Sequence, residues 1–216
     1  MRFIPVMLNV TDKKLLIVGG GRAAALKLQS LASKFEEITV VSERFDPLFD
    51  GSDVKKVVRR IDSPQSVAEL IDRETIVVIA SDDLSLNEKL REYCKMKGVL
   101  FNSVDRIDSP FIFPAAFTSN GVTVSVSTEG RSPSLSRFLK RQLAQLAQRY
   151  SQALPTLERL REVTANEDHG ERARFFDELL EDPEFWRLVE GGDEEGAWKY
   201  GLKLLSELKR EATPKR

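Results

Sequence analysis

The chain has 216 residues, of which 41% are hydrophobic and 31% charged, and its formal net charge at pH 7 is -1. This composition is typical of a soluble globular protein with one large or two small domains, and so small a net charge gives no field that would steer the chain to nucleic acid. The apolar runs are too short to span a bilayer, and the first residues lack the apolar core of a signal peptide, so we expect no membrane association.

Cysteine and histidine each occur once, as Cys94 and His169. A single cysteine excludes an intrachain disulfide and a cysteine-rich zinc site, and it fits a reducing cytosol, so we expect a cytoplasmic protein. We interpret Cys94 as a small buried side chain on a helix. His169 lies in a polar run and is interpreted as an exposed residue at a helix start. We therefore predict no metal site and no enzyme that depends on a catalytic histidine.

The first half of the chain alternates strand and helix patterns. Strands are predicted at 14–18, 38–42, 54–59, 75–80 and 99–104, and helices at 23–31, 66–71 and 84–97. Strands that alternate with helices indicate a parallel sheet covered on both faces, and the right-handed crossover rule makes it doubly wound. The predicted fold class is therefore α/β, with a Rossmann-like parallel sheet.

A glycine-rich turn joins the first predicted strand to the first helix. Gly19, Gly21 and Ala24 fit the G-x-G-x-x-G/A spacing, which allows a tight turn, admits a pyrophosphate and lets the helix pack on the strand. Glu43 follows at about the spacing of a ribose-binding acid. This pattern predicts a bound nucleotide; the alternative is an ordinary turn in which glycine only supplies a positive φ.

Ligands of doubly wound sheets bind at the carboxyl ends of the strands. That edge of the predicted sheet collects segments 19–22, 42–44 and 81–83 together with Asp105. A carboxylate at the end of the fifth strand can accept or orient a proton. The alternative for Asp105 is a side chain that closes a turn after the strand.

After Asp105 the pattern changes. An extended segment, the turn Ser119-Asn120-Gly121 and the alternating run 122–127 predict a hairpin. Ser132 as N-cap and Pro133 in the first turn predict a long helix. Its helical spacing predicts one buried face, made of Leu135, Phe138, Leu139, Gln142, Leu143, Leu146 and Ala147. From Glu158 on, the chain is predicted to be helical, with breaks at Gly170, Asp182-Pro183 and Gly191-Gly192.

Residues 130–157 contain no acidic side chain but several basic ones: Arg131, Arg137, Lys140, Arg141 and Arg149. Arg137, Lys140 and Arg141 share one helical face, and arginine binds carboxylates and phosphates well. Two interpretations stay open, a site for a polyanionic small molecule and a solvated helix face. Nucleic acid is not an expected partner, because no aromatic side chains interleave with the basic ones.

Five motifs follow one another along the chain: Gly19-Gly20-Gly21 with Lys27, Ala80-Ser81-Asp82-Asp83 with Asn87, Asn102-Ser103-Val104-Asp105, Phe113-Pro114-Ala115, and Ser127-Thr128-Glu129-Gly130-Arg131-Ser132-Pro133-Ser134-Leu135 with Arg137. Together they resemble the precorrin-2 dehydrogenase family, the dehydrogenase and ferrochelatase part of sirohaem synthase. The resemblance runs from Phe3 to about Gln142 and continues weakly beyond. It implies NAD-dependent oxidation of precorrin-2, a tetrapyrrole, to sirohydrochlorin in sirohaem biosynthesis; some members also insert Fe²⁺.

The resemblance implies an NAD-binding Rossmann domain over residues 1–112, a dimerisation region over 113–150 that forms a homodimer, and a helical C-terminal domain over 151–216. It implies nucleotide contacts from Gly19, Gly20, Gly21, Arg22, Ala23, Glu43, Arg44, Ser81 and Asp82. Asp105 matches the acidic residue of the family's catalytic centre. The tetrapyrrole pocket would be bordered by Ser127, Thr128, Gly130, Arg131, Ser132 and Arg137.

The chain also departs from the family pattern. Ala23 and Leu26 replace a Val and an Arg, Phe35 replaces a Gly, and Glu129 replaces a Gly in the S-T-x-G-x-S-P loop. Two functions therefore stay open: a dehydrogenase in which Asp105 assists proton removal, and a non-catalytic NAD- or tetrapyrrole-sensing module. The sequence also leaves open whether Fe²⁺ is a substrate. NADP is a further alternative to NAD, because Arg44 could meet a 2′-phosphate that Glu43 would repel.

Overall fold

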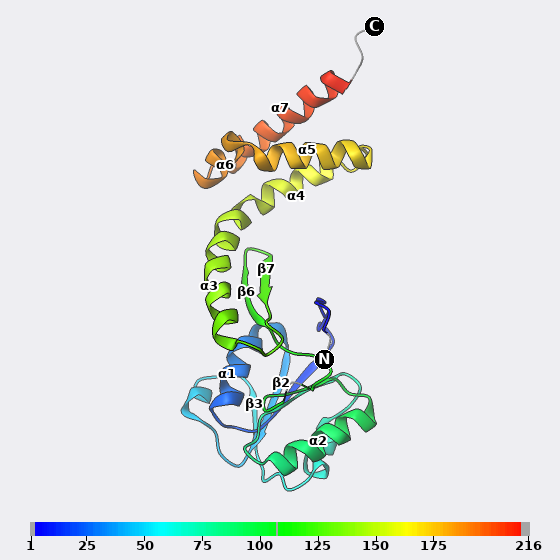
Figure 1. Cartoon of the computed structure of the whole chain (residues 1–216), viewed down its shortest axis with the longest axis vertical. Coiled ribbons are helices and arrows are strands. Elements are labelled where there is room, and N and C mark those ends of the chain that lie inside the picture. The colour runs from blue at the N-terminus through cyan, green and yellow to red at the C-terminus, as the bar shows by residue number, and fades with distance from the viewer. Residues whose placement is uncertain (1–2, 107, 213–216) are drawn as a thin grey trace. The chain divides into compact units, whose positions relative to one another are not determined.

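The computed structural model of the chain describes residues 3–106 and 108–212, the last without its side chain. The chain divides into two compact units, Met1–Phe113 and Pro114–Arg216. The first unit holds the glycine turn and Asp105, and the second holds the hairpin, the long helix and the helical tail (Figure 1).

The first unit is a five-stranded parallel sheet with helices on both faces. Its strands are β1 (Lys14–Val18), β2 (Glu37–Ser42), β3 (Lys55–Val58), β4 (Thr75–Ile79) and β5 (Phe101–Ser103). Its α-helices are α1 (Arg22–Leu31) and α2 (Leu84–Lys97). The strand order is β3-β2-β1-β4-β5 and every pair is parallel. This confirms the predicted Rossmann-like α/β fold, in which the order reverses between β1 and β4.

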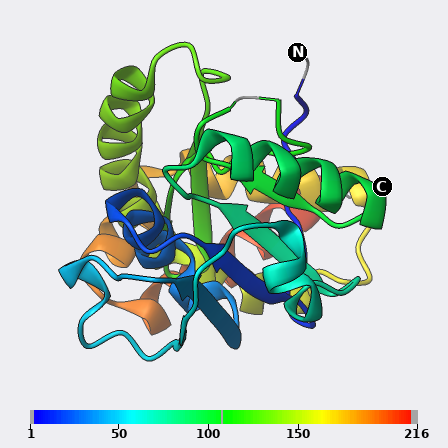
Figure 2. The same ribbon diagram turned by 90° about the horizontal axis from the view of Figure 1, so that it is seen from below.

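Alternate residues of the central strand β1 serve the two faces of the sheet. Leu15 and Ile17 belong to the core under α1, whereas Leu16 and Val18 belong to the core under α2. Figure 2 shows these two helices flanking the sheet. Strands that are buried on both faces read as continuous apolar runs, which is why β1 and β4 were recognisable in the sequence.

Helix α2 has the bounds that the sequence predicts. The carboxylate of Asp83 accepts the N–H groups of Ser85 and Leu86, and Gly98 ends the helix in the left-handed region at φ 66°. The following strand is shorter than predicted, because the N–H of Val99 still bonds to the carbonyl of Cys94. The predicted helix at 66–71 is wrong in type: Pro64–Leu70 forms a 3₁₀-helix.

The second unit begins with an antiparallel hairpin of β6 (Ala115–Ser119) and β7 (Val122–Val126). Asn120 and Gly121 form its turn at φ 43° and 81°, as tight hairpin turns require. The hairpin packs on α3 (Pro133–Tyr150), which Ser132 caps. The hairpin and the start of the long helix are thus where the sequence predicts them.

The helical tail consists of α4 (Leu154–Val163), α5 (His169–Glu181), α6 (Pro183–Glu190) and α7 (Glu194–Ala212). Phe175, Leu179 and Phe185 lie at the centre of its core. The breaks predicted at Asp182-Pro183 and Gly191-Gly192 are confirmed. The break predicted at Gly170 is wrong, because Asp168 accepts the N–H of Gly170 and so starts α5 ahead of that glycine.

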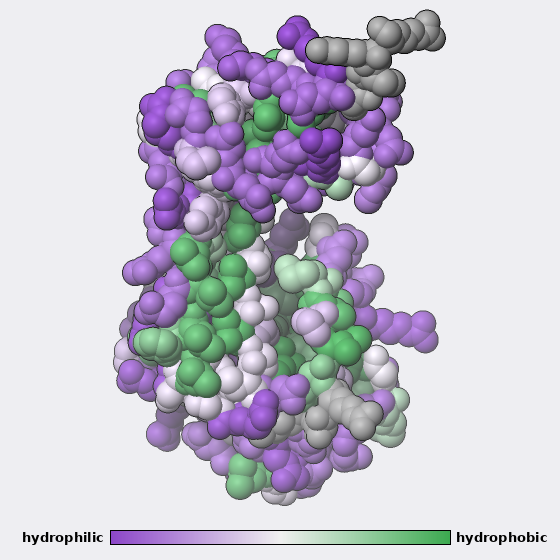
Figure 3. All heavy atoms as spheres, turned by 45° about the horizontal axis from the view of Figure 1, so that its top comes forward, coloured by the Kyte–Doolittle hydropathy of each residue, from purple (hydrophilic) through white to green (hydrophobic). Residues whose placement is uncertain are grey.

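The predicted buried face of α3 is mostly exposed within one chain. Leu135, Phe138, Leu143 and Leu146 are 47%, 48%, 37% and 49% exposed, and only Ala147 of that face is buried. The buried residues of α3 are Ser136 and Ala147, and the helix packs on both strands of the hairpin. Figure 3 shows hydrophobic side chains gathered on the surface over α3.

Cys94 and His169 lie as predicted. Cys94 is fully buried on α2, and burial raises the pKa of its thiol to about 12. His169 is exposed as the first residue of α5. Within residues 3–106 and 108–212, no helix is long and apolar enough to cross a membrane.

Candidate functional site

A cavity of about 460 Å³ opens at the carboxyl ends of β1, β2 and β4 in the first unit. Its size is within the range of small-molecule sites, roughly 300–1,000 Å³. It is lined by Gly19, Gly20, Gly21, Ser42, Glu43, Arg44, Phe45, Asp46, Ala80, Ser81 and Asp82. The structure therefore brings together the predicted nucleotide contacts, with Arg22 and Ala23 following Gly21 as the first residues of α1.

The three glycines of the turn differ in what an added side chain would meet. Gly19 has φ 119°, and a Cβ there would lie 2.6 Å from the carbonyl carbon of Ala80. At Gly20 a Cβ would lie 2.7 Å from the Cβ of Ser42. At Gly21 no atom lies within 4 Å of the added Cβ. The first two glycines let neighbouring loops approach, whereas Gly21 keeps clear a space that the protein does not itself fill.

Within the part of the chain that the structure describes, no side chain caps the N-terminus of α1. Gly21 provides no side-chain cap, and the first turn contains no acidic residue. Free N–H groups and the positive end of the helix dipole make such a terminus suited to a phosphate group. Since Gly21 also lines the cavity, this end of α1 fits the pyrophosphate of a dinucleotide.

Glu43, which lines the cavity, lies close to a basic side chain. Glu43 follows β2, and its carboxylate lies 3.8 Å from the guanidinium of Arg60, which is held more closely by Asp62 at 2.7 Å. The side chain of Glu43 is 56% exposed. A carboxylate at this position accepts hydrogen bonds from ribose hydroxyls and repels a 2′-phosphate.

Asp105 lies just beyond β5, and its carboxylate is held by several groups. The hydroxyl of Ser103 donates to Oδ1, and the guanidinium of Arg91 lies 3.4 Å from Oδ2. Burial raises the pKa of the Asp105 carboxyl, but the hydrogen bonds from Ser103 and from its own backbone N–H, together with the charge of Arg91, outweigh this and lower it. Asp105 is therefore ionised at neutral pH, with a side chain that is 20% exposed.

Asn87 connects Asp105 to the cavity. Its amide nitrogen donates to the carbonyl of Ser81 at 2.9 Å, its amide oxygen lies 2.5 Å from the hydroxyl of Ser81, and its side chain is also hydrogen-bonded to Asp105. Ser81 lines the cavity and Asp105 does not, so Asn87 joins the catalytic candidate to the nucleotide edge. An ionised carboxylate placed in this way can accept or orient a proton beside a bound nucleotide.

Sequence reasoning missed Arg91, which is only 3% exposed. A signal was present: Leu86, Leu90 and Cys94 mark the buried stripe of α2, and Asn87 and Arg91 lie in it. A charged side chain in a buried stripe must find a partner. The partner, Asp105, lies 14 residues further along the chain and could not be identified from helical spacing.

The predicted tetrapyrrole contacts lie in the second unit, in the loop between β7 and α3 and, for Arg137, in α3 itself. The hydroxyl of Thr128 accepts the N–H of Ser132 and donates to its carbonyl oxygen, both at 3.0 Å. Glu129, at φ 51°, and Gly130, at φ 78°, shape the loop in left-handed conformations. Ser127, Arg131 and Arg137 are exposed. The role of these residues toward a substrate stays a prediction.

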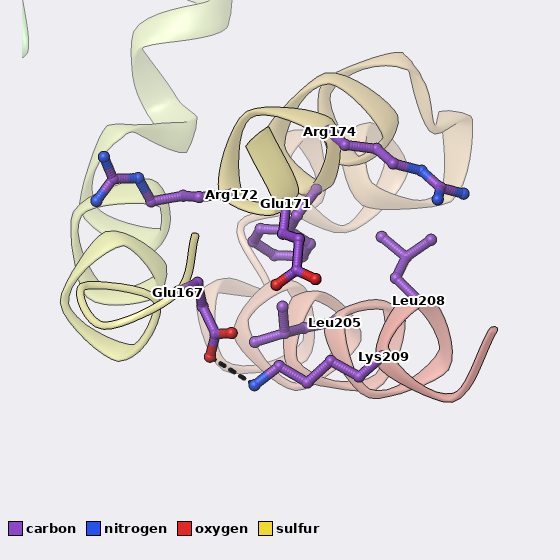
Figure 4. A pocket seen from close by; sticks show the side chains of 8 residues that line it. Glu167, Glu171, Arg172, Arg174, Leu205, Leu208 and Lys209 are labelled. Carbon is purple, nitrogen blue, oxygen red and sulfur yellow. Dashed lines mark hydrogen bonds and ion pairs between the residues drawn. The ribbon is translucent and has the colours of Figure 1, made fainter. Parts of the chain in front are cut away.

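The helical tail offers a much smaller hollow beside α5 and α7, with a volume of about 40 Å³ (Figure 4). Phe175, Leu205 and Leu208 line its apolar part, and an ion pair between Lys209 and Glu167 at 2.5 Å lies at its rim. That volume is of the order of one or two water molecules and cannot hold a nucleotide or a tetrapyrrole.

A comparison with protein families matches mainly the first unit. A family model described as putative NAD(P)-binding matches residues 6–115, which include the glycine turn, Glu43 and Asp105. Within residues 3–106 and 108–212, no group of three or more His, Cys, Asp or Glu side chains could hold a metal ion.

Curated relatives extend beyond that match. The chain is similar to a siroheme synthase of Thioalkalivibrio sulfidiphilus, with 30% identity over 187 residues, 85% of this chain and 38% of that protein. It is also similar to a siroheme synthase of Nitrosococcus oceani, with 31% identity over 201 residues, 90% of this chain and 42% of that protein. The chain thus spans about two fifths of the length of these relatives, 38% and 42%.

Among solved structures, the chain is similar to one described as SirC, precorrin-2 dehydrogenase. The TM-score is 0.66, and the match covers 96% of this chain and 100% of that one. With 20% sequence identity, this likeness shows a shared fold.

Proposed function

Because the chain belongs to the family of putative NAD(P)-binding proteins, we propose that it is a dehydrogenase that oxidises precorrin-2 to sirohydrochlorin with NAD⁺. The observation that carries the proposal is the chain of hydrogen bonds from Ser81, on the nucleotide cavity, through Asn87 to the ionised carboxylate of Asp105. The likeness to siroheme synthases over most of this chain, and the fold shared with SirC, support the same activity.

The residues present fit a dinucleotide. The glycine turn and the uncapped end of α1 would hold the pyrophosphate, and Glu43 would bind the ribose. When bound, NAD⁺ supplies the hydride acceptor. Glu43 favours NAD over NADP, since the positive charge of Arg60 beside it is already held by Asp62. Arg44, Ser81 and Asp82 complete the proposed contacts.

In this proposal Asp105 is the catalytic residue. Its low pKa keeps the carboxylate charged, so that it can take or orient the proton that leaves the macrocycle as the hydride is lost. The carboxylates of the substrate would meet the basic side chains of the loop after β7 and of α3, including Arg131 and Arg137. Glu129 lies in the same loop and would oppose an anionic group, so substrate affinity would be higher without it.

The same proposal includes a homodimer. The exposed apolar side of α3, with Leu135, Phe138, Leu143 and Leu146, is the surface that a second copy would cover. Obligate dimers bury about 2,000 Å² or more, a larger area than one helix face offers, so we expect the hairpin to take part as well. Residues 113–150 would then be the dimerisation region and 151–216 a separate helical domain, and the single cysteine suits a cytoplasmic location.

Anaerobic conversion of precorrin-2, followed by absorption spectroscopy, tests the proposed function. We expect sirohydrochlorin to appear with NAD⁺ and to be absent without it. Fe²⁺ or Co²⁺ is added once sirohydrochlorin has formed, and a further spectral change would establish ferrochelatase activity. Tight binding of NAD⁺ or tetrapyrrole without turnover would contradict the dehydrogenase and favour the non-catalytic sensing module.

A further inference from the structure

Among the described residues of the first unit, one charged side chain is almost completely withdrawn from water. Arg91 projects from the middle of α2, and 3% of its side chain is exposed. Its guanidinium contacts Glu88, lies 3.4 Å from Asp105 and lies 3.5 Å from the hydroxyl of Ser103. A buried guanidinium is tolerated only when it is paired in this way, so its surroundings require an explanation.

Helix α2 holds Arg91 at a fixed place relative to the end of β5. The helix is capped by Asp83 at one end and by Gly98 at the other, and Leu90 and Cys94, on either side of Arg91 in the sequence, are fully buried. A planar guanidinium on such a support presents its donors in a fixed direction. Arg91 therefore restrains one oxygen of the Asp105 carboxylate, while the hydroxyl of Ser103 holds the other.

From this geometry we infer that Arg91 is a positioning residue, which keeps the carboxylate of Asp105 charged and oriented for the proposed reaction. The inference rests on the proposed function, because it assigns Asp105 to catalysis. Arg91 itself acts only through Asp105 and touches no residue that lines the nucleotide cavity among its described contacts.

Other charged groups surround this pair. Glu88, with 51% of its side chain exposed, shares Arg91 with Asp105, and Arg106 lies 3.7 Å from Glu88. Asp108 lies 3.9 Å from Arg106, further along the same loop. Glu88 competes for Arg91, so its negative charge opposes the effect of Arg91 on Asp105. Removal of Glu88 is thus expected to act in the opposite direction to removal of Arg91.

The test measures the pKa of Asp105 in the full chain by carboxyl ¹³C NMR, in the absence of substrate and nucleotide. In Arg91→Met we expect this pKa to rise, because an adjacent opposite charge that favours the carboxylate is lost. Arg91→Lys keeps a cation and should restore most of the wild-type value. Lys95→Met, the loss of an exposed cation one turn along the same helix, should leave the pKa unchanged, and Glu88→Gln should not raise it.

The pH dependence of turnover then relates this pKa to the reaction. The acidic limb of the kcat profile should move upward in Arg91→Met by the same amount as the pKa, and not in Lys95→Met. An unchanged pKa in a folded Arg91→Met protein would overturn the inference. If that variant does not fold, the wild-type titration decides, because a pKa of Asp105 at or above about 3.9, the ordinary value, would overturn it too.

The two proposals can fail separately. A rise in pKa without any movement of the kcat profile would leave the coupling of Arg91 to Asp105 intact and would remove Asp105 from the reaction. A protein that does not oxidise precorrin-2 at all still yields the NMR titration. The pKa measurement therefore tests the positioning role of Arg91, and the pH profile of kcat tests the catalytic role of Asp105.

Discussion

A side chain at Gly19 would place its Cβ 2.6 Å from the carbonyl carbon of Ala80, so the turn after β1 and the end of β4 meet with no room between them. Gly19 also has φ 119°, a conformation that other residues avoid. These restrictions concern the fold itself. Gly21, two residues later, has φ -78° and no such neighbour, and the two glycines can therefore be separated by experiment.

We predict that Gly21→Val folds normally but no longer binds NAD⁺, because its side chain enters the space proposed for the pyrophosphate. In the wild type, NAD⁺ in large excess over its dissociation constant should stabilise the fold by about 2–3 kcal/mol. Thermal unfolding with and without millimolar NAD⁺ measures this. Gly19→Ala is the comparison, and it should lower the melting temperature even without nucleotide. An equal shift by NAD⁺ in wild type and Gly21→Val would contradict the prediction.

Glu43 should determine the preference for NAD over NADP. Replacement by Gln removes the charge that repels a 2′-phosphate, so we expect the ratio of the two dissociation constants to shift toward NADP⁺ by about tenfold, which corresponds to ~1.4 kcal/mol. Calorimetric titration with each nucleotide gives that ratio. Glu36→Gln, which removes an exposed carboxylate that does not line the cavity, is the control and should leave the ratio unchanged. A ratio that is the same in Glu43→Gln and wild type would remove Glu43 from the ribose site.

For Asp105 we expect a loss of rate with little loss of structure. Asp105→Asn keeps the shape of the side chain, and Arg91 retains its contact with Glu88. Loss of proton-transfer assistance should slow turnover by about 10²–10⁴-fold while NAD⁺ affinity stays near wild type. Asp108→Asn, in the same loop, is the matched control. Rate, affinity and melting temperature are measured on one preparation, and a rate within about threefold of wild type would refute the catalytic assignment.

The apolar side of α3 predicts the oligomeric state. Light scattering should report about twice the 24.4 kDa of one chain at micromolar concentration. The substitution Leu143→Glu should shift the protein toward monomer, since it places a charge in the proposed interface. Leu180, which is 40% exposed on α5, serves as the control position for the same substitution. A wild-type mass of one chain would refute the dimer.

A further prediction concerns stability in the helical tail. The hydroxyl of Tyr200 donates to Asp182 at 2.6 Å, and this bond, followed by backbone N–H donors at the start of α6, lowers the pKa of Asp182 despite partial burial. A pKa lowered by folding adds stability above the unfolded value, and that stability is lost as the pH falls through the folded value. Asp182→Ala should therefore cost about 1 kcal/mol near neutral pH, as a lost N-cap does.

Urea unfolding of wild type and Asp182→Ala, at neutral pH and at pH values below about 3.9, measures this difference. The free energies of unfolding of the two proteins should become similar at the most acidic pH. Tyr200→Phe keeps the N-cap and removes only the hydroxyl, so its effect should be the smaller one. If the difference in the free energy of unfolding grew toward acidic pH, the ionised carboxylate of Asp182 would not be the source of the stability.

Much of the first unit could be predicted because its signals are local. Asp83 and Gly98 mark both ends of α2 by capping alone, and the apolar runs of β1 and β4 need no knowledge of their partners. The glycine turn and Glu43 could be assigned to one site because the carboxyl ends of parallel strands share an edge. Local signals were thus enough to predict the parallel sheet and the segments that line the cavity at its edge.

The features that local patterns did not predict have a different origin. The sequence pattern of α3 shows which side chains are apolar, but it does not show whether the hairpin or another molecule covers them. Glycine disfavours a helix, yet α5 includes Gly170 because the N-cap at Asp168 determines where the helix starts. Arg91 and Asp105 meet only when β5 lies beside α2, so their relationship depends on tertiary structure. The start of α5 thus depends on a local cap, whereas the surroundings of α3 and Arg91 depend on contacts across the fold.

The burial of Cys94 has a practical consequence for spectroscopy. With a thiol pKa of about 12 and no exposed surface, the chain's single cysteine reacts too slowly with maleimides or nitroxide reagents to compete with an exposed thiol. A cysteine introduced at an exposed position, such as Ser125 on the hairpin, would then be the one labelled site. Distance measurements by fluorescence or electron paramagnetic resonance can thus begin from the natural chain, without a cysteine-free background.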